Sequence, residues 1–526
     1  MIHRILFLLV FSCLSQFIFA QSVITGFVFN DQNSNRKKDR NEKGIANVSV
    51  SNGRDVVVTD AQGKYSISVG SDNIVFVIKP SGYQFHMDRY NSPQFFYIHK
   101  PAGSPASFKY KGVSRTGGIP ASVDFAMRPV SESTKFSALV FGDPQPYNLR
   151  ELDYFNESIV QDIRNAGNYS FGISLGDLVG DDLTLHEPYK KYISTLGIPW
   201  YHVMGNHDMN LDAVADSLSD ESFEENFGPN NYAWNYADAH FIILDNIIYP
   251  DPRDGKGYIG GFRQDQLDFL ENNLRHIDKN NLLVISYHIP LDNAAGGSNH
   301  FRDADRKRFF AILKDFSNVL LMSAHTHFQE QIYYTEKHGW FGKQPLHEYN
   351  AGTTSGDWYS GSTANKAFPD GTMRDGTPRG YAYLNIKQNT YDIQYQVMGK
   401  PADYQIEIYA PKVIAQNKRT SALIYANFFM GHKTDLVEFR VGDGKWKKMD
   451  YTESADPNYM KSLMDWDASE TVVPGRRPSN ALLSTHLWSA GIPFKLDAGE
   501  HIIEVRATDR YGKQHTAKKT YRVVAD

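Results

Sequence analysis

The sequence predicts an α/β protein whose central layered domain lies between two all-β sandwich domains. Residues 23–133 contain short alternating runs, such as VITGFVFN and YSISV, separated by Asp, Asn and Gly turns. From about residue 135 to 398, apolar runs alternate with segments of helical periodicity, which is typical of an α/β domain. From about residue 400 to 526 the pattern returns to strand periodicity. A chain of 526 residues is also too long for one hydrophobic core.

The two outer domains, predicted over residues 21–133 and 399–526, are expected to consist of strands. GIANV at residues 44–48, followed by TDAQGKY at residues 59–65, resembles the prealbumin-like or B-type repeat sandwiches of bacterial surface proteins. The tail ends in HIIEVRATDRYGKQHTAKKTYRVV, which indicates two strands around a turn at residues 509–512 and is similar to immunoglobulin-like modules.

The central domain, predicted over residues 134–398, is expected to alternate between strands and helices. Its strands are predicted at the apolar runs FSALVF, FGISL, WYHVM, HFIIL, LLVIS and NVLLMS. Helical periodicity predicts helices over residues 151–166, 264–277 and 302–315. Such alternation favours a domain in which helices cover the faces of a sheet.

The N-terminus has the pattern of a secretory signal peptide. Arg4 precedes an apolar run, and Ala20 precedes Gln21 at a plausible cleavage point. A membrane anchor is the weaker interpretation, because the run is short for a span and polar residues interrupt it. We therefore expect residues 1–20 to be removed on export. The mature protein is then periplasmic, secreted or bound to the cell surface, and no later segment is predicted to be transmembrane.

Composition restricts the partners and the metal ligands. The single cysteine, Cys13, lies in the predicted signal peptide, so the mature chain is expected to have no disulfide and no thiolate ligand. The formal net charge of -5 gives no reason to expect a nucleic-acid or anionic-membrane partner. Any transition-metal site must therefore use His, carboxylate and amide groups. The oligomeric state is left open.

Five of the predicted strands end in residues that can bind a metal ion. FSALVF is followed by Gly-Asp-Pro-Gln, FGISL by Gly-Asp, WYHVM by Gly-Asn-His-Asp, LLVIS by Tyr-His, and NVLLMS by Ala-His-Thr-His. Loops at the carboxyl ends of strands in open α/β sheets line one crevice, so these side chains are expected to converge. The candidate donors are Asp143, Gln145, Asp177, Asn206, His207, His288, His325 and His327.

These donors indicate a site for two metal ions. Oxygen and imidazole ligands suit Zn, Mn or Fe better than they suit a soft metal. His325 and His327, two residues apart on an extended segment, can flank paired metals from the same side. The carboxylate of Asp177 can bridge two ions about 3.5–4 Å apart, the spacing typical of two-metal hydrolysis. Each motif alone is common in loops, but all five in this order favour a binuclear site.

The motifs resemble those of the calcineurin-like metallophosphoesterases, in the order Asp-x-His, Gly-Asp, Gly-Asn-His-Asp/Glu, His and Gly-His-x-His. The resemblance covers about half of the chain, and the flanking domains look like the companion β domains of exported phosphoesterases of Bacteroidetes-type bacteria. It implies a four-layer β-sandwich flanked by helices. It also implies that Asp143, Gln145, Asp177 and His327 hold the first metal. Asp177, Asn206, His288 and His325 would hold the second, with Asp177 as the bridge.

The resemblance implies catalytic roles as well. His207 matches a histidine that stabilises the transition state or protonates the leaving group, and Asp208 would orient His207 or a neighbouring ligand. Two divalent ions lower the pKa of a bridging water, so that hydroxide can attack phosphorus in line. Gln145 stands where the family usually has His. Since its amide oxygen is a weaker, neutral ligand, we expect a functional but more labile first metal.

Two arginines and a Gly-rich loop are candidates for substrate contacts. Trp358 and Tyr359, in the loop over residues 350–361, form a wall of the substrate site or simply anchor the loop. Arg374 and Arg379 each either grip a phosphate or lie solvated at the surface.

Residues 31–42 have the donor spacing of an EF-hand calcium loop. The donors are Asp31, Asn33, Asn35, Asp39 and Glu42. Arg36 stands where such loops normally have Gly, which argues against a standard turn. A calcium site and a polar connection between two strands are both open.

Together these patterns predict an exported, metal-dependent phosphoric ester hydrolase, a phosphatase or phosphodiesterase. Monoesters, diesters and lipid headgroups are open as substrates, because selectivity depends on pocket shape and not on the ligands. The alternative is a non-catalytic adhesin or glycan-binding protein with a degenerate phosphoesterase core. A degenerate core is expected to have lost His207, His288 or His325, and all three are present.

Overall fold

The structure is a computed structural model that describes residues 22–163, 168–292, 300–364 and 366–525, and its central part contains two β-sheets. The strands of the first sheet are, in spatial order, β11 (Trp200–His202), β10 (Phe171–Ser174), β9 (Lys135–Phe141), β21 (Gly380–Lys387) and β22 (Thr390–Val397). Those of the second are β12 (Tyr232–Tyr236), β13 (Ala239–Ile243), β16 (Leu282–Ser286), β17 (Asn318–Ser323), β19 (Leu346–Asn350) and β18 (Glu330–Tyr334). All six predicted apolar runs contribute strands to these sheets.

The two central sheets pack against each other through aromatic side chains. Phe171 of β10 contacts Phe241 of β13 with ring centroids 5.1 Å apart, and Phe136 of β9 lies 6.4 Å from the same ring. Strands β9, β10 and β11 are parallel, as are β13, β16, β17 and β19, so the carboxyl ends within each group share one edge. The residues of β10, β13 and β16 are all buried, which matches their continuous apolar runs.

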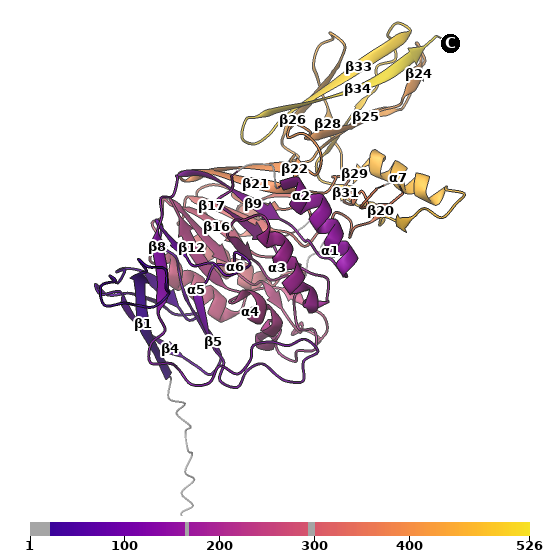
Figure 1. The fold of residues 1–526 in the computed structure, drawn as a ribbon. Coiled ribbons are helices and arrows are strands. Elements are labelled where there is room, and N and C mark those ends of the chain that lie inside the picture. Colours follow the sequence, from indigo (N-terminus) through magenta and orange to yellow (C-terminus); the bar gives the residue numbers. More distant parts are fainter. Residues whose placement is uncertain (1–21, 164–167, 293–299, 365, 526) are drawn as a thin grey trace, which may run out of the picture.

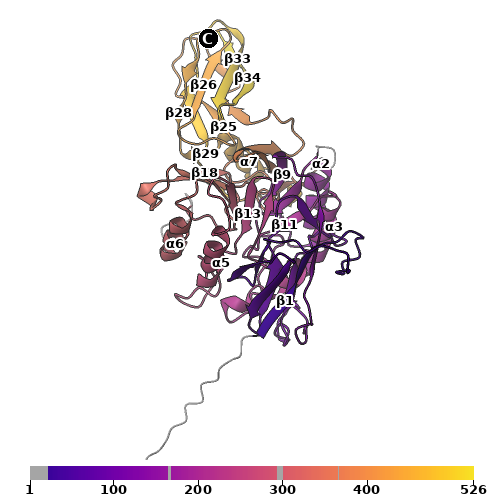
Figure 2. The ribbon, with the colours of Figure 1, turned by 90° about the vertical axis from the view of Figure 1, so that its left-hand side faces the viewer.

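Helices cover the outer faces of the two sheets and complete the predicted four layers (Figure 2). The helices are α1 (Leu149–Phe155), the π-helix η1 (Asn156–Val160), α2 (Gln161–Ile163), α3 (His186–Ser194), α4 (Glu221–Phe227), α5 (Gln264–Leu274) and α6 (Asp303–Leu313). Figure 2 shows α5 and α6 on one side of the strands and α3 on the other. The predicted helices over 264–277 and 302–315 are α5 and α6, whereas α3 and α4 were not predicted. The predicted helix over 151–166 is divided by η1, and its last residues lie outside the described part.

The first domain is a sandwich of two four-stranded sheets, as predicted. One contains β4 (Lys64–Val69), β1 (Ser22–Asn30), β8 (Phe125–Pro129) and β6 (Tyr83–Phe85). The other contains β3 (Val56–Val58), β2 (Ser49–Ser51), β5 (Asn73–Val77) and β7 (Phe96–His99). Its core is continuous with that of the central domain, because Phe76 packs on Phe269 at 5.6 Å and Phe95 on Tyr232 at 5.1 Å.

The C-terminal part forms a second β-sandwich with a separate core and projects from the central domain at the end away from β1 and β4 (Figure 1). One sheet contains β23 (Ile406–Tyr409), β25 (Leu423–Phe428), β32 (Leu487–Gly491) and β28 (Asp450–Tyr451). The other contains β24 (Val413–Ala415), β34 (Gln514–Val524), β33 (Gly499–Thr508), β26 (Leu436–Val441) and β27 (Lys447–Lys448). The predicted hairpin is confirmed as β33 and β34.

The C-terminal part contains a helix where the sequence predicted only strands. Helix α7 (Pro457–Asp467) begins after Asp456, whose side chain accepts a hydrogen bond from the backbone of Tyr459. An Asp N-cap followed by Pro at the first helical position is a helix-start signal that strand periodicity concealed. Short paired strands lie outside the main sheets: β14 (Ile247–Ile248) with β15 (Ile259–Gly260), β20 (Gly361–Ser362) with β30 (Gly475–Arg476), and β29 (Ser454–Ala455) with β31 (Leu483–Ser484).

The predicted signal peptide, residues 1–20, lies outside the described residues. Among the helices that the structure does describe, none has both the length and the apolar character needed to cross a membrane. The predicted domain boundaries at residues 133 and 398 stay predictions.

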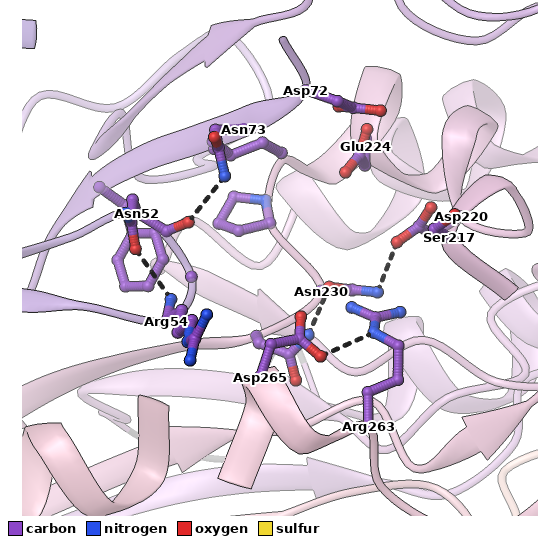
Figure 3. A pocket seen from close by; sticks show the side chains of 15 residues that line it. Asn52, Arg54, Asp72, Asn73, Ser217, Asp220, Glu224, Asn230, Arg263 and Asp265 are labelled. Atoms are coloured by element: carbon purple, nitrogen blue, oxygen red, sulfur yellow. Dashed lines mark hydrogen bonds and ion pairs between the residues drawn. The ribbon is translucent and has the colours of Figure 1, made fainter. Parts of the chain in front are cut away.

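A buried ion cluster joins the first domain to the central one. The ammonium group of Lys100, which is almost fully buried, lies 2.6 Å from a Glu221 oxygen and 2.8 Å from a Glu224 oxygen on α4. Beside it, a cavity of about 380 Å³ is lined by residues of both domains, among them Asn52, Asp72 and Arg263 (Figure 3). None of the predicted metal ligands lines this cavity.

We expect Lys100→Met to lower the free energy of unfolding by about 3–5 kcal/mol, because the substitution leaves buried carboxylates without their cation. Urea-induced unfolding measures the loss. Lys111→Met, at an exposed position, is the matched control and is expected to be neutral. A Lys100→Met protein as stable as the parent would show that the cluster does not hold the two domains together.

Candidate metal centre

The predicted metal ligands follow five strands and meet where the two central sheets present their carboxyl ends. Asp143 and Gln145 follow β9, Asp177 follows β10, and Asn206 follows β11, all in the first sheet. His288 follows β16, and both His325 and His327 follow β17, in the second sheet. The donors therefore come from two facing sheets, in agreement with the predicted four-layer sandwich, and the convergence does not need a single open sheet.

Carboxylate and imidazole groups form two clusters that share Asp177. One cluster contains Asp177, His288 and His325, and the other contains Asp143, Asp177 and His327. Within each cluster the ligand atoms all lie within 4.8 Å of one another. Sharing one carboxylate is the arrangement needed for a bridging ligand between two metal ions.

The two amide residues of the predicted set join these clusters. Asn206 Oδ1 lies 3.1 Å from Nε2 of His288, and the Gln145 amide nitrogen donates to Asp177 Oδ2 at 3.1 Å. The Gln145 oxygen, Oε1, is buried and has no hydrogen-bond partner among the described residues. A buried carbonyl oxygen without a partner is costly unless a cation or donor satisfies it.

Nε2 of His288 lies among oxygen atoms that can only accept a hydrogen bond or bind a cation. His288 Nδ1 donates to the backbone oxygen of Leu175 at 2.8 Å, so Nε2 is the nitrogen that can hold either a second proton or a metal ion. That Nε2 faces Oδ1 of Asn206 and, at 3.3 Å, Oδ1 of Asp177, which is also an acceptor. A positive charge is needed among these atoms, from a proton on Nε2 or from a metal ion that takes its place. The residues present therefore fit two metal ions.

The backbone at the ligands is strained. Five non-glycine ligands have positive φ: Asp143 (27°), Gln145 (38°), Asp177 (46°), His325 (69°) and His327 (59°). Such conformations cost about 1–3 kcal/mol each and concentrate at functional sites. Two glycines permit the approach of the loops, since a Cβ on Gly205 would lie 1.9 Å from Asp177 N and one on Gly176 would lie 2.3 Å from His288 Nδ1.

The surroundings of the ligands set their protonation states to those that bind a metal ion. Burial lowers the pKa of both His325 and His327 to about 3, so both imidazoles are neutral and able to ligate at neutral pH. Burial opposes ionisation of Asp177, but the positive charges of His288 and His207 outweigh it and hold the pKa of this carboxyl below its usual value. Asp177 is therefore an anionic ligand.

No hydrogen bond joins His207 to Asp208 among the described residues, and the contacts of Asp208 fit the other role predicted for it, the orientation of a neighbouring ligand. His207 is a quarter exposed, and its Nδ1 lies 2.7 Å from Oδ1 of Asp181. Asp181, and not Asp208, therefore orients His207. Asp208 is buried and accepts hydrogen bonds from the backbone of Gly205 at 2.9 Å and Leu178 at 3.1 Å. It thus fixes the two loops that carry Asp177 and Asn206. The second Gly-Asp in GDLVGDD was the available sequence signal for Asp181.

The predicted substrate residues divide into two groups. The ring of Trp358 stacks on His327 with centroids 4.3 Å apart, and the guanidinium carbon of Arg374 lies 5.3 Å from the Trp358 ring centre. Tyr359 and Arg379 are buried instead: the Tyr359 hydroxyl donates to the Pro144 backbone oxygen, and Arg379 donates to that of Pro369 at 2.7 Å. Both side chains are buried and bind loop backbone, so the structure does not support their predicted substrate contact, and for Tyr359 it fits the alternative of anchoring the loop.

Two tyrosines near the centre were not predicted. The ring of Tyr147 meets that of His207 edge to face with centroids 5.8 Å apart, and Tyr258 meets His325 in the same way at 6.0 Å. Both tyrosines are about one-third exposed. They therefore form the rim of the centre together with Trp358.

The predicted calcium loop contains two buried carboxylates, Asp31 and Glu42. Asp31 accepts from the backbone of Asn35 at 3.2 Å and of Arg36 at 2.9 Å, and Asp31 Oδ2 lies 2.7 Å from Nε2 of His86. Glu42 accepts from two further backbone N–H groups of the loop. The amide nitrogens of Asn33 and Asn35 donate to Asp39. A hydrogen-bonded turn explains these contacts with or without a cation, so calcium stays a prediction.

Three family models match successive parts of the chain. The model for the N terminal of Calcineurin-like phosphoesterase matches residues 31–114, that for Calcineurin-like phosphoesterase matches 136–329, and that for the C terminal of Calcineurin-like phosphoesterase matches 348–515. The chain therefore belongs to the calcineurin-like phosphoesterases, a family of metal-dependent enzymes, and carries N- and C-terminal companion domains.

Solved structures give distant likenesses only. A dimetal phosphatase from Danio rerio is 13% identical, with 49% of this chain and 95% of that chain covered and a TM-score of 0.33. A purple acid phosphatase from yellow lupin (Lupinus luteus) seeds is 11% identical, with 71% of this chain and 66% of that chain covered and a TM-score of 0.36. No curated protein matches the chain. We base the family assignment on the family models.

Gln145→Ala is expected to weaken binding of the first metal about tenfold, because the substitution removes one ligand and leaves the others in place. Gln145→His is expected to retain both metals, since imidazole is the stronger donor. Metal content after dialysis, together with titration calorimetry, measures the change. Gln62→Ala, at an exposed turn, is the control. Unchanged metal content in Gln145→Ala would show that Gln145 is not a ligand.

Proposed function

We propose that the protein is an exported phosphatase or phosphodiesterase that hydrolyses a phosphate monoester or diester with the help of two metal ions. The observation that carries the proposal is the pair of ligand clusters that share Asp177. When bound there, two divalent ions would polarise the phosphoryl oxygens and supply an activated water. Zn, Mn and Fe all suit the donor set.

His207 is the proton donor in this proposal. Its Nδ1 is engaged by Asp181, so Nε2 is the atom left for the substrate. Burial lowers the pKa of His207, but the carboxylates of Asp177 and Asp181 outweigh burial and raise it to about 9. The ring therefore carries a proton at neutral pH and can give it to the leaving-group oxygen as the ester bond breaks.

The surroundings favour a small phosphoester or a lipid headgroup as substrate. Tyr147, Tyr258 and Trp358 provide apolar surface next to the polar centre. Such a rim limits access of water and offers faces for the organic part of the substrate. We include export in the proposal because of the signal-peptide pattern over residues 1–20, which leads to the periplasm, the medium or the cell surface.

The proposal predicts hydrolysis of p-nitrophenyl phosphate or bis-p-nitrophenyl phosphate by the Mn²⁺-loaded protein. His207→Ala is expected to lower kcat about a hundredfold or more, because a positioned proton donor contributes that much. Asn206→Ala is expected to lower both activity and metal content. His276→Ala, on an exposed turn, is the control for loss of a histidine. No hydrolysis of either ester with Mn²⁺, Zn²⁺ or Fe²⁺ would favour the non-catalytic alternative.

Asp181→Asn is expected to move the alkaline limb of the pH–kcat profile to lower pH by about one unit. His207 acts in its protonated form, so activity falls as the pH rises through the pKa of this ring. Removing the adjacent carboxylate charge lowers that pKa. Asp182→Asn, which keeps an oxygen for the adjacent turn, is the control. An alkaline limb that does not move in Asp181→Asn would exclude His207 as the titrating group.

A further inference from the structure

A segment of the C-terminal part reaches the rim of the metal centre. Strand β30 pairs with β20, and the pairing extends through a hydrogen bond of 2.9 Å from Thr363 N to Pro474 O. Ser479 N donates to Asp357 Oδ2 at 2.6 Å, which ties the same segment to the loop that carries Trp358. Figure 1 shows β20 beside α7, away from the main C-terminal strands.

This pairing brings Arg476 to the rim. Its Nη1 donates to the backbone oxygen of Trp358 at 3.4 Å, and the rest of the side chain is exposed. Burial and the carboxylates Asp181 and Asp177 raise the pKa of Tyr147 to about 12, and the charge of Arg476 acts in the opposite direction. The guanidinium group is therefore within electrostatic range of a ring that contacts His207.

Arg374 also contacts Trp358. It lies over the indole ring, whose stacking partner is His327, and its Nη2 donates to Thr326 O at 3.4 Å. Its Nε is buried and has no hydrogen-bond partner among the described residues. A buried guanidinium N–H without an acceptor is a donor available to a ligand.

Neither arginine has a carboxylate partner within the described residues. Arg477, the next residue, does: its Nε and Nη2 bind both oxygens of Asp467 at 2.6 and 2.7 Å. Among the carboxylates near the rim, Asp181 bonds His207, and Asp357 accepts from Ser360 and Ser479 through Oδ2, whereas Asp357 Oδ1 has no hydrogen-bond partner among the described residues. Neither guanidinium group is thus held in an ion pair among the described residues, and both lie next to Trp358 at the rim of the candidate metal centre.

We propose that Arg374 and Arg476, which both contact Trp358, form an anion-binding subsite that receives a second negatively charged group of the substrate. This inference rests on the proposed phosphoesterase function. The preferred substrate is then a phosphoester with a carboxylate or a second phosphate. Guanidinium groups suit both, since their planar N–H fork binds two oxygens of such groups.

Titration calorimetry with matched ligands tests the subsite. The measurement uses the Mn²⁺-loaded full chain with the substitution His207→Ala, because this variant keeps every predicted metal ligand and hydrolyses the ligands slowly. In this background 3-phosphoglycerate, with its carboxylate, is expected to bind about tenfold more tightly than glycerol 3-phosphate, because it gains a charged hydrogen bond. The bisphosphate of 1,3-propanediol tests a second phosphate in the same way. If only one of the two ligands with a second anionic group is preferred, its second group is the one that the subsite binds.

In the same His207→Ala background, Arg374→Gln and Arg476→Gln are each expected to reduce the preference for 3-phosphoglycerate over glycerol 3-phosphate at least threefold. Arg476→Lys is expected to retain part of this preference. Arg477→Gln is the matched control and is expected to keep the preference. Melting temperatures separate lost recognition from misfolding. The subsite is overturned if both ligands with a second anionic group bind no better than glycerol 3-phosphate, if no ligand binds, or if the preference survives in the double variant.

Hydrolysis of p-nitrophenyl esters by the otherwise unchanged protein separates the two proposals. Hydrolysis without a ligand preference overturns only the subsite. Absence of hydrolysis with every metal overturns the proposed function, whatever the calorimetry shows.

Discussion

The carboxylate of Asp177 is the group on which the rest of the centre depends. It belongs to both ligand clusters, and it also accepts a hydrogen bond from the backbone of His207 at 3.0 Å. The backbone oxygen of the same residue accepts from Gln145 N at 2.9 Å. One residue thus connects the loops after three strands of the first sheet with the histidines of the second. A buried anion in this position requires nearby positive charge, which metal ions and protonated histidines both supply.

Strain at the ligands can persist because the strands beneath them are rigid. Each ligand with positive φ follows a strand whose last residues are fully buried, so the loop ends cannot relax without disturbing the core. Asp208 adds three backbone hydrogen bonds at the junction of the loops after β10 and β11. The geometry of the donors is therefore fixed before any ion binds, which reduces the reorganisation that metal binding requires.

The strands and the metal ligands could be predicted from the sequence, because both depend on short-range patterns. The partners of individual side chains could not be predicted where segments distant in the chain meet. Buried strands have continuous apolar runs, so the strand ends and their ligands could be located. The pattern could not distinguish Asp181 from Asp208 as the partner of His207, since both follow a ligand within a few residues. Nor could it tell that Tyr359 and Arg379 are buried, because that depends on Pro144 and Pro369 in other turns. The approach of Arg476 to Trp358 joins residues 118 positions apart, and no local signal marks it.

A buried polar network connects the C-terminal sandwich to the segment that follows the ligand His327. The carboxylate of Asp375 accepts from Gln329 N at 2.9 Å and contacts His486 Nε2 at 3.1 Å. Gln329 lies two residues beyond His327, and His486 belongs to the C-terminal part, where its Nδ1 lies 2.7 Å from Oδ1 of Asn427. A displacement of this domain would therefore disturb both the segment after His327 and the loop of Trp358. Since buried polar networks are costly to break, this network holds the C-terminal part in place against the segment after His327.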